Sequence, residues 1–358
     1  MRSLQSTPEP VYHGALDYQE LENMGLDPEK VLDFSVNSNP FSPSTGVRRA
    51  LASVPLDRYP DKESLALRRA LAGQMGVSPE TILIGNGVAE LIWLTAFAFL
   101  HAGDHVLILN PTFGEYDRSA QLMGANPQAW TALPETGFTP DTVGLSRELD
   151  RTGYRAVFLC NPNNPTGQIL PVEIISAWTQ AHPATLFIVD EAYVAFVPRM
   201  ESMLNHLREN ILILRSMTKD YALAGLRLGY AVGDESLIQT IARVRPPWNV
   251  NALAQAAGLA ALQDNAYYQQ TLAQVQSEKR FLVEGLTQLG YAPCSSQTHF
   301  FLLPVANGRE FRARLIPHGI LVRDCASFGL PEYVRIAPRT REENARLLAV
   351  LSTISDHG

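Results

Sequence analysis

Six short apolar runs, separated by segments with a helical pattern, constrain the fold of this chain more than any other feature. The runs are rich in Val, Ile and Leu, and their apolar side chains occupy consecutive positions instead of alternating ones. This pattern indicates mostly parallel strands covered by helices on both faces. Ligands of such α/β sheets collect beyond the carboxyl ends of the strands, so the residues after each run are the first candidates for a site. The runs are residues 81–84, 105–109, 156–160, 186–189, 211–214 and 229–232.

The chain beyond residue 251 has a different pattern, in which helical segments mix with short strands. This mixture predicts a smaller α+β domain, completed by the N-terminal forty residues. We therefore expect a large domain over residues 41–250 and a small domain formed by residues 1–40 and 251–358. The expected strands of the small domain are residues 299–303, 320–323 and 333–337, and its expected helices include residues 267–289, 309–316 and 341–351.

Length, charge and cysteine content exclude several classes of protein. At 358 residues and 46% hydrophobic content, the chain can fill one large core and one smaller core. A formal net charge of −7 argues against binding to a nucleic-acid backbone, which depends on clustered Lys and Arg. Three cysteines without CxxC spacing provide no disulfide or metal framework and suit a reducing compartment. The N-terminus lacks a signal-peptide pattern, and the longest apolar run, residues 89–100, is shorter than the ~20 residues that span a bilayer. We expect a cytoplasmic protein in which this run is a buried helix.

Lys219 differs in its surroundings from the other three lysines. Lys30, Lys62 and Lys279 have charged or polar neighbours, whereas Lys219 follows one apolar run and precedes another. A lysine at the end of a buried strand is partly desolvated, which lowers its pKa and favours the neutral amine that condenses with an aldehyde. Taken alone, Lys219 would more simply be an inactive lysine in a loop, so its interpretation depends on its neighbours.

Asp190 ends the apolar run at residues 186–189, and Tyr193 follows three positions later. A carboxylate at a buried strand end is costly unless a cation meets it. A protonated pyridine nitrogen is one such partner, and an arginine of the protein is the alternative. The first pairing would keep the pyridine ring an electron sink.

Two loops after other runs add candidate polar groups. Residues 161–167, Asn-Pro-Asn-Asn-Pro-Thr-Gly, form a turn that aims Asn164 back across the sheet edge, with a cis bond before Pro165 as one option. Residues 85–90, Gly-Asn-Gly-Val-Ala-Glu, join a strand to a helix and offer backbone N–H groups to a phosphate. The position of a third dinucleotide-binding glycine holds Glu90, so one phosphate fits better than two.

The order of these motifs along nearly the whole chain resembles fold-type I pyridoxal-phosphate enzymes of the aspartate-aminotransferase type. The resemblance implies a mostly parallel seven-stranded sheet, a Schiff base between pyridoxal 5'-phosphate and Lys219, and Asp190 on the pyridine nitrogen. It further implies a homodimer with shared active sites. The remaining implied cofactor contacts are Tyr193 and Asn164 on the phenolic oxygen, Phe113 stacked on the ring, Ser216, Arg227 and the amides of Val88 and Ala89 on the phosphate, and Tyr59 reaching the phosphate from the neighbouring subunit.

The resemblance leaves two candidate reactions, those of threonine-phosphate decarboxylase of cobalamin biosynthesis and of histidinol-phosphate aminotransferase. Residues 32–40, 247–253 and 333–340 lean towards the decarboxylase, partly because Arg339 precedes Thr340 where aminotransferases usually have glycine. Ala15 and Pro338 depart from the decarboxylase pattern. We therefore predict decarboxylation of threonine phosphate first and transamination of histidinol phosphate as the alternative. By resemblance, a substrate carboxylate and phosphate would be bound by Arg335, Arg323, His13 and Asn37, while charge alone does not assign which arginine meets which anion.

Two other classes of function are weaker. An NAD-dependent oxidoreductase built on Gly85-x-Gly87 would have no use for Lys219 and Asp190. A protein that binds the cofactor without turnover would leave the intact lysine unexplained.

Overall fold

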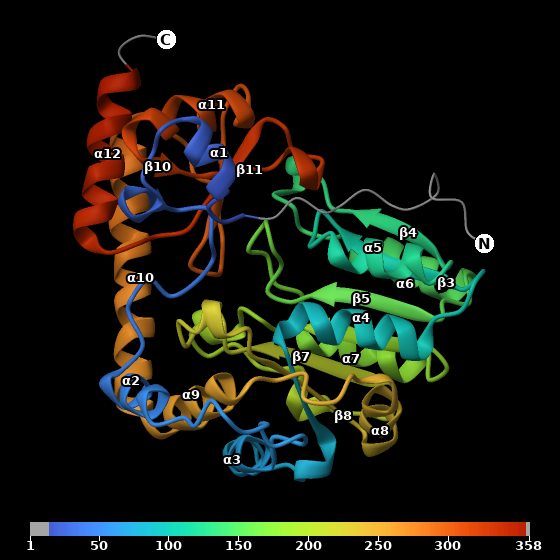
Figure 1. Ribbon diagram of the computed structural model, residues 1–358. Helices are drawn as coiled ribbons and strands as arrows, with labels where there is room; N and C mark the ends of the chain where they lie inside the picture. Colours follow the sequence, from blue (N-terminus) through green and yellow to red (C-terminus); the bar gives the residue numbers. More distant parts are fainter. Residues whose placement is uncertain (1–13, 356–358) are drawn as a thin grey trace.

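A seven-stranded sheet forms the centre of the larger lobe in the computed structural model, which describes residues 14–355 (Figure 1). The strand order is β2-β8-β7-β6-β5-β3-β4. Only β8 runs antiparallel to its neighbours in this sheet, so the prediction of a mostly parallel α/β sheet is confirmed. The strands are β2 (Ile82–Gly85), β3 (His105–Asn110), β4 (Asn126–Thr131), β5 (Ala156–Cys160), β6 (Leu186–Asp190), β7 (Ile211–Ser216) and β8 (Gly229–Gly233).

All six apolar runs are strands, and their ends differ from the prediction by at most two residues. Strand β4 was missed because it is an edge strand that pairs only with β3 and leaves most of its residues at least partly exposed. Its sequence, Asn-Pro-Gln-Ala-Trp-Thr, therefore lacks the continuous apolar run of strands buried on both faces.

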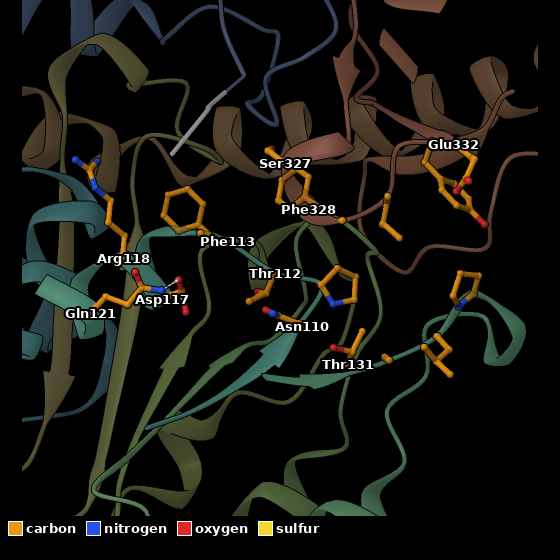
Figure 2. A pocket seen from close by; sticks show the side chains of 18 residues that line it. Asn110, Thr112, Phe113, Asp117, Arg118, Gln121, Thr131, Ser327, Phe328 and Glu332 are labelled. Atoms are coloured by element: carbon orange, nitrogen blue, oxygen red, sulfur yellow. Dashed lines mark hydrogen bonds between the residues drawn. The ribbon is translucent and has the colours of Figure 1, made fainter. Parts of the chain in front are cut away.

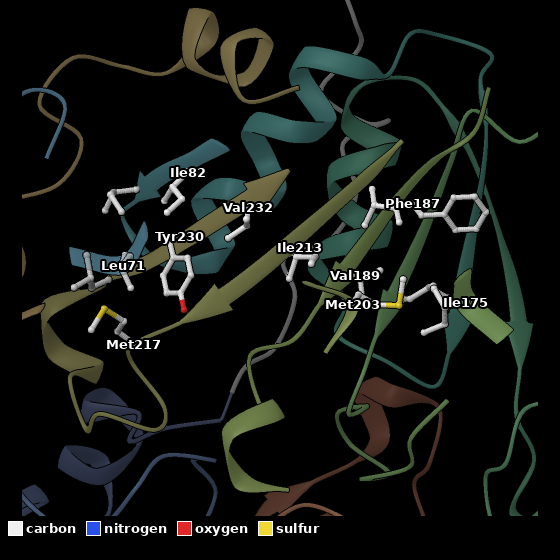
Figure 3. Close-up of a cluster of buried hydrophobic side chains, with 14 of the residues drawn as sticks. Leu71, Ile82, Ile175, Phe187, Val189, Met203, Ile213, Met217, Tyr230 and Val232 are labelled. Carbon is white, nitrogen blue, oxygen red and sulfur yellow. The ribbon is translucent and has the colours of Figure 1, made fainter. Parts of the chain in front are cut away.

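Consecutive residues of the central strands enter different cores, one on each face of the sheet. On β6, Phe187 and Val189 belong to the cluster shown in Figure 3, whereas Ile188 belongs to the opposite cluster. Each side chain buried in this way contributes about 1.5–3 kcal/mol relative to exposure. Helices α4 (Gly87–Phe99), α5 (Glu115–Leu122) and α8 (Glu235–Val244) line the core with Ile188, and α3 (Leu65–Met75), α6 (Thr142–Arg151), α7 (Val172–Ala181) and α9 (Ala252–Gln263) line the other.

The smaller lobe joins the two ends of the chain. Strand β1 (Leu32–Asp33) pairs in parallel with β10 (Ile320–Leu321), which ties the N-terminal segment to the C-terminal one. A separate antiparallel sheet has the order β11-β12-β9, so the expected strand at residues 320–323 is divided between two sheets. The other elements are β9 (Phe301–Pro304), β11 (Arg323–Asp324), β12 (Tyr333–Ile336), α1 (Tyr18–Asn23), α10 (Asn265–Gln288), α11 (Gly308–Leu315) and α12 (Arg341–Ser355).

The 24-residue helix α10 connects the two lobes (Figure 1). Its far end packs beside α12, while α9, just before it, packs against α2 (Thr45–Ala52) and α3 in the core of the large lobe. The division of domains at residues 41 and 251 stays a prediction. The expected buried helix at 89–100 is α4, and no helix within residues 14–355 is long and apolar enough to cross a membrane.

Candidate active site

Two adjoining cavities lie at the carboxyl edge of the large sheet, where it meets the small lobe. The inner cavity has a volume of about 110 Å³ and the outer cavity about 320 Å³. They share Lys219, Asn164 and Arg227 among their lining residues. Of the predicted site residues, the inner cavity is lined by Val88, Ala89, Phe113, Asn164, Asp190, Tyr193, Ser216, Lys219 and Arg227, and the outer cavity adds Asn37, Arg323 and Arg335.

Asp190, the last residue of β6, is 4% exposed and faces the inner cavity. Its Oδ2 accepts a hydrogen bond from the Tyr116 hydroxyl at 2.7 Å, and its Oδ1 accepts one from the Ala192 amide at 2.9 Å. Burial raises the pKa of the carboxyl to about 6, while these two hydrogen bonds and the charge of Lys219 lower it. The carboxylate is therefore mostly ionised at neutral pH and suited to pair with a cation in the cavity.

Lys219 lines both cavities, and its backbone is held by the N-terminal segment. The Asn39 amide donates to the Lys219 carbonyl at 2.8 Å. Burial, followed by the charges of Arg335 and Arg227, lowers the pKa of the ammonium to about 8, and Asp190 opposes this change. Roughly a tenth of the amine is then neutral at pH 7, against well under a thousandth at an ordinary lysine pKa. This amine is prepared to attack a carbonyl carbon.

The first turn of helix α4 lines one end of the inner cavity. The Asn86 side chain makes no cap for this helix, and Val88 and Ala89 of its first turn line the cavity. Gly87 has a φ of +79°, and a Cβ atom there would lie 2.8 Å from the Arg227 guanidinium. Free N–H groups at a helix start beside a guanidinium form an anion site.

Glu90 lies in the first turn of α4 but is engaged away from the cavities. Its carboxylate accepts hydrogen bonds from the Asn86 amide and from the Asn249 side chain, both at 2.6 Å. It lines neither cavity, so its charge is directed to the outer side of the turn.

Two arginines from the small lobe enclose the outer cavity. Arg323 on β11 is the direct cross-strand partner of Arg335 on β12, and both side chains line the cavity. Arg335 donates to the Asn164 side-chain oxygen and, at 2.6 Å, to the Ser35 carbonyl. Arg323 donates to the Ser327 hydroxyl at 2.6 Å and lies 5.3 Å from the centre of the Phe328 ring. Two neighbouring guanidiniums make this cavity strongly attractive for anions.

Tyr193 adds a phenol to both cavities, which Asn164 also lines. Burial raises its pKa above the ordinary value, and the charge of Arg335 opposes that effect. The hydroxyl is therefore protonated at neutral pH and able to donate a hydrogen bond into the cavity. The predicted cis bond between Asn164 and Pro165 is present.

A larger entrance pocket of about 790 Å³ adjoins the outer cavity (Figure 2). The two share Phe113, Gly114, Ser327 and Phe328. In Figure 2, α5 contributes Asp117, Arg118 and Gln121 on one side, while Ser327 and Phe328 of the small lobe lie across from them. A small molecule thus has a route between the lobes to the cavities.

Tyr59 lies outside both cavities. It is 80% exposed and stacks on Trp248 with 4.6 Å between ring centres. It borders an apolar surface groove of about 550 Å³. His13, the remaining predicted site residue, lies outside the described residues.

The sequence interpretation missed several residues that line the cavities, among them Tyr116, Cys160 and Thr218 in the inner cavity and Phe328 in the outer one. Tyr116 carried a usable signal, because it follows Phe113 by three positions in the segment after a predicted strand. Cys160 ends a predicted strand, and a lone cysteine there gives no signal beyond that of a packed thiol. Phe328 had no such signal, since a short 3-10 turn at residues 326–328 carries it to the site.

The residues present fit pyridoxal 5'-phosphate. An ionised acid for the ring nitrogen, an amine with a lowered pKa and a helix start for the phosphate all border the inner cavity. Gly229, next to this helix start, has no room for a side chain, because a Cβ atom there would lie 2.9 Å from the Val88 amide nitrogen. The two glycines thus allow β8 and Arg227 to pack closely against the first turn of α4.

Comparisons with known proteins agree with this geometry. Residues 29–351 match the model for aminotransferase class I and II. The chain is 35% identical over 340 residues to histidinol-phosphate aminotransferase of Moorella thermoacetica, covering 92% of this chain and 86% of the relative. It is 37% identical over 336 residues to that of Anaeromyxobacter sp., covering 90% and 91%.

Solved structures give the same result. Histidinol-phosphate aminotransferase from Sinorhizobium meliloti in complex with pyridoxal-5'-phosphate superposes with a TM-score of 0.86 and 27% identity, over 95% of each chain. Aspartate aminotransferase from Thermotoga maritima has a TM-score of 0.82 at 21% identity over 94% of each chain, which shows the fold alone. The chain therefore belongs to the class I and II aminotransferase family and is a fold-type I, pyridoxal-phosphate-dependent enzyme.

Proposed function

We propose that the chain transfers the amino group of histidinol phosphate to 2-oxoglutarate. The observation that carries this proposal is the pair Arg323 and Arg335, which brings two guanidiniums to one cavity beside Lys219. A substrate with a phosphate and an acceptor with two carboxylates both need such a site. The relatives named histidinol-phosphate aminotransferase support the same choice over decarboxylation.

Each predicted site residue of the inner cavity has a proposed task. Lys219 binds the cofactor covalently through its aldehyde, Asp190 holds the ring nitrogen protonated, and Phe113 stacks on the ring. When bound, the cofactor supplies an electron sink for the bonds of the substrate's amine-bearing carbon. The proposed phosphate ligands are Ser216, Arg227 and the amides of Val88 and Ala89, and the proposed ligands of the phenolic oxygen are Asn164 and Tyr193.

Lys219 also moves the proton of the reaction. The ε-amino group of Lys219, when not bonded to the cofactor, would carry a proton to or from the substrate, in the cavity that lowers its pKa to about 8. An amine with this pKa both accepts and returns a proton near neutral pH. Arg335 and Arg323 would bind the anionic groups of the substrate, and the orientation that they impose would decide which bond of the substrate's amine-bearing carbon is broken.

A homodimer completes the proposal. Leu56, Tyr59 and Trp248 are 80%, 80% and 46% exposed, and Tyr59 borders the apolar groove of about 550 Å³. Large exposed apolar side chains beside a groove indicate a surface that another protein covers. We propose that a second copy covers it and that Tyr59 reaches the cofactor phosphate of that copy.

Decarboxylation of threonine phosphate is the second candidate, favoured by the resemblance of residues 32–40, 247–253 and 333–340. One residue that carries this resemblance lies outside both cavities. Arg339 donates to the Asp33 carbonyl at 3.0 Å and to Glu343 at 2.8 Å, and it lines neither cavity. Arg339 therefore contributes to packing of the small lobe, and its presence does not favour either reaction.

One assay separates the two candidates. The purified enzyme is incubated with histidinol phosphate and 2-oxoglutarate, and in parallel with threonine phosphate alone. We expect glutamate in the first reaction and no carbon dioxide in the second. Release of carbon dioxide from threonine phosphate without formation of glutamate in the first reaction would replace the proposal by the decarboxylase. Activity in neither would overturn both substrates while leaving the cofactor assignment in place.

A further inference from the structure

Tyr116, near the start of α5, is a fully buried residue whose hydroxyl points to the end of β6. Its ring stacks on Phe158 with 5.2 Å between centres and meets the edge of Phe113 at 5.7 Å. It is 0% exposed, and its hydroxyl donates to Asp190 Oδ2 at 2.7 Å. The sequence resemblance assigned no role to this residue.

The Asp190 carboxylate accepts two hydrogen bonds from the protein, one on each oxygen. Tyr116 binds one oxygen and the Ala192 amide binds the other. An ionised carboxylate offers about four acceptor sites, so two donors from the protein fix its plane and leave capacity for a third partner. A third partner would reach the carboxylate from the inner cavity, which both Tyr116 and Asp190 line.

We propose that Tyr116 is a positioning residue that orients the Asp190 carboxylate and keeps it ionised, so that Asp190 can hold the cofactor nitrogen protonated. This inference rests on the role proposed above for Asp190. A hydrogen bond to a charged acceptor is roughly twice as strong as one between neutral groups, and it favours the ionised form. The phenol itself remains a donor, because burial and the charge of Asp190 both raise its pKa.

The packing of the ring and the action of the hydroxyl can be separated by experiment. Tyr116→Phe removes one oxygen and keeps the contacts with Phe158 and Phe113. Tyr154→Phe is a matched control, since Tyr154 is 4% exposed and its hydroxyl lies 2.8 Å from Glu148 Oε1 and 2.6 Å from Gln128 Oε1, away from both cavities. Both variants remove one hydroxyl of a tyrosine that is hydrogen bonded to an acidic side chain.

The test measures the dissociation constant of pyridoxal 5'-phosphate from pH 5.5 to 9, with the melting temperature of the cofactor-free protein as a second readout. We expect Tyr116→Phe to weaken binding about ten- to a hundredfold at pH 7. The pH below which binding declines should rise by about one unit, because Asp190 loses a donor that favours its charge. Tyr154→Phe should keep the wild-type binding curve.

Three outcomes decide the inference. A wild-type binding curve for Tyr116→Phe overturns it, and so does an equal weakening by Tyr154→Phe. The variant Asp190→Asn distinguishes failure of the Tyr116 inference from failure of the proposed function. If Asp190→Asn binds the cofactor normally, the proposed role of Asp190 is wrong. If Asp190→Asn weakens binding and Tyr116→Phe does not, only the positioning role fails.

A second variant serves if Tyr116→Phe does not fold. Replacement of Tyr116 by 3-fluorotyrosine keeps the hydroxyl and makes it a stronger donor. The decline in cofactor binding should then move to lower pH, opposite to the effect of Tyr116→Phe, and an unchanged curve would contradict the inference.

Discussion

The inner and outer cavities share Lys219 but are built from different parts of the chain. The walls of the inner cavity come from the carboxyl ends of neighbouring strands and the turns after them, as with Asp190 on β6 and Ser216 on β7. The outer cavity adds Asn37, Arg323 and Arg335 from the small lobe, which is formed by both ends of the chain. The first site is therefore fixed within one sheet, whereas the second exists only when two lobes meet.

This difference separates chemistry from selection of the substrate. In the proposed function, residues of the inner cavity would act on the cofactor, which is common to the family, while residues of the outer cavity would bind the part of the substrate that varies. Substitutions in the inner cavity should affect retention of the cofactor and turnover. Substitutions of small-lobe residues that line the outer cavity should raise KM and leave the cofactor in place.

The largest expected effect is that of Lys219→Ala. Removing the amine takes away the covalent attachment of the cofactor and the proton carrier, so we expect kcat to fall by at least about a thousandfold. Circular dichroism should show an unchanged fold. Lys62→Ala, at a lysine with 62% side-chain exposure, is the control and should keep full activity. Undiminished steady-state activity of Lys219→Ala would refute the role of this residue.

The lowered pKa of Lys219 predicts how stability changes with pH. Its pKa is about 8 in the folded protein and 10.5 for an ordinary lysine, so the unfolded chain binds more protons between these values. The free energy of unfolding of the cofactor-free protein should therefore rise from pH 8 to pH 10.5 through this group, by up to about 3 kcal/mol. Urea titrations of wild type and Lys219→Met across this range measure the difference. Parallel curves for the two proteins would mean that Lys219 has an ordinary pKa.

Arg335→Lys tests the small-lobe side of the comparison. A lysine keeps the charge but loses the forked donors that contact Asn164 and the Ser35 carbonyl. We expect KM for the anionic substrates to rise about tenfold or more, with the affinity for pyridoxal 5'-phosphate within about twofold of wild type. Arg339→Lys, also in the small lobe but outside both cavities, should change neither quantity. Loss of the cofactor from Arg335→Lys would contradict the assignment of cofactor binding to the inner cavity and of substrate binding to the outer cavity.

The sequence predicted the inner cavity better than the outer one, for a physical reason. Asp190, Ser216 and Lys219 follow apolar runs, and parallel strands bring their carboxyl ends to one edge. No local pattern brings Arg323 opposite Arg335, because their pairing depends on the register of two short strands in the small lobe. Only the resemblance to known enzymes singled out these arginines. Edge strand β4 escaped prediction because it lacks a continuous apolar run.

Tyr116 and Tyr59 illustrate contacts that sequence patterns alone do not predict. The hydroxyl of Tyr116 meets Asp190 across 74 positions of sequence, so the pairing required the packing of α5 on the sheet. Tyr59 is exposed in a single chain, and its predicted contact lies in a second copy. The chemistry of individual strand ends can thus be predicted from sequence, while contacts between helices, lobes and subunits need coordinates.

Gly87→Ala gives the smallest expected effect and examines the phosphate end of the inner cavity. The φ of +79° strains any residue with a Cβ atom, and that atom would lie 2.8 Å from the Arg227 guanidinium, which has to move. Gly103→Ala is a matched control, because Gly103 has a φ of +91° and nothing within 4 Å of the added atom. Both variants should lose about 1 kcal/mol of stability from backbone strain. Only Gly87→Ala should also weaken the binding of pyridoxal 5'-phosphate, by several-fold, as measured by equilibrium dialysis. Equal cofactor affinity in the two variants would show that Arg227 does not bind the phosphate from its present position.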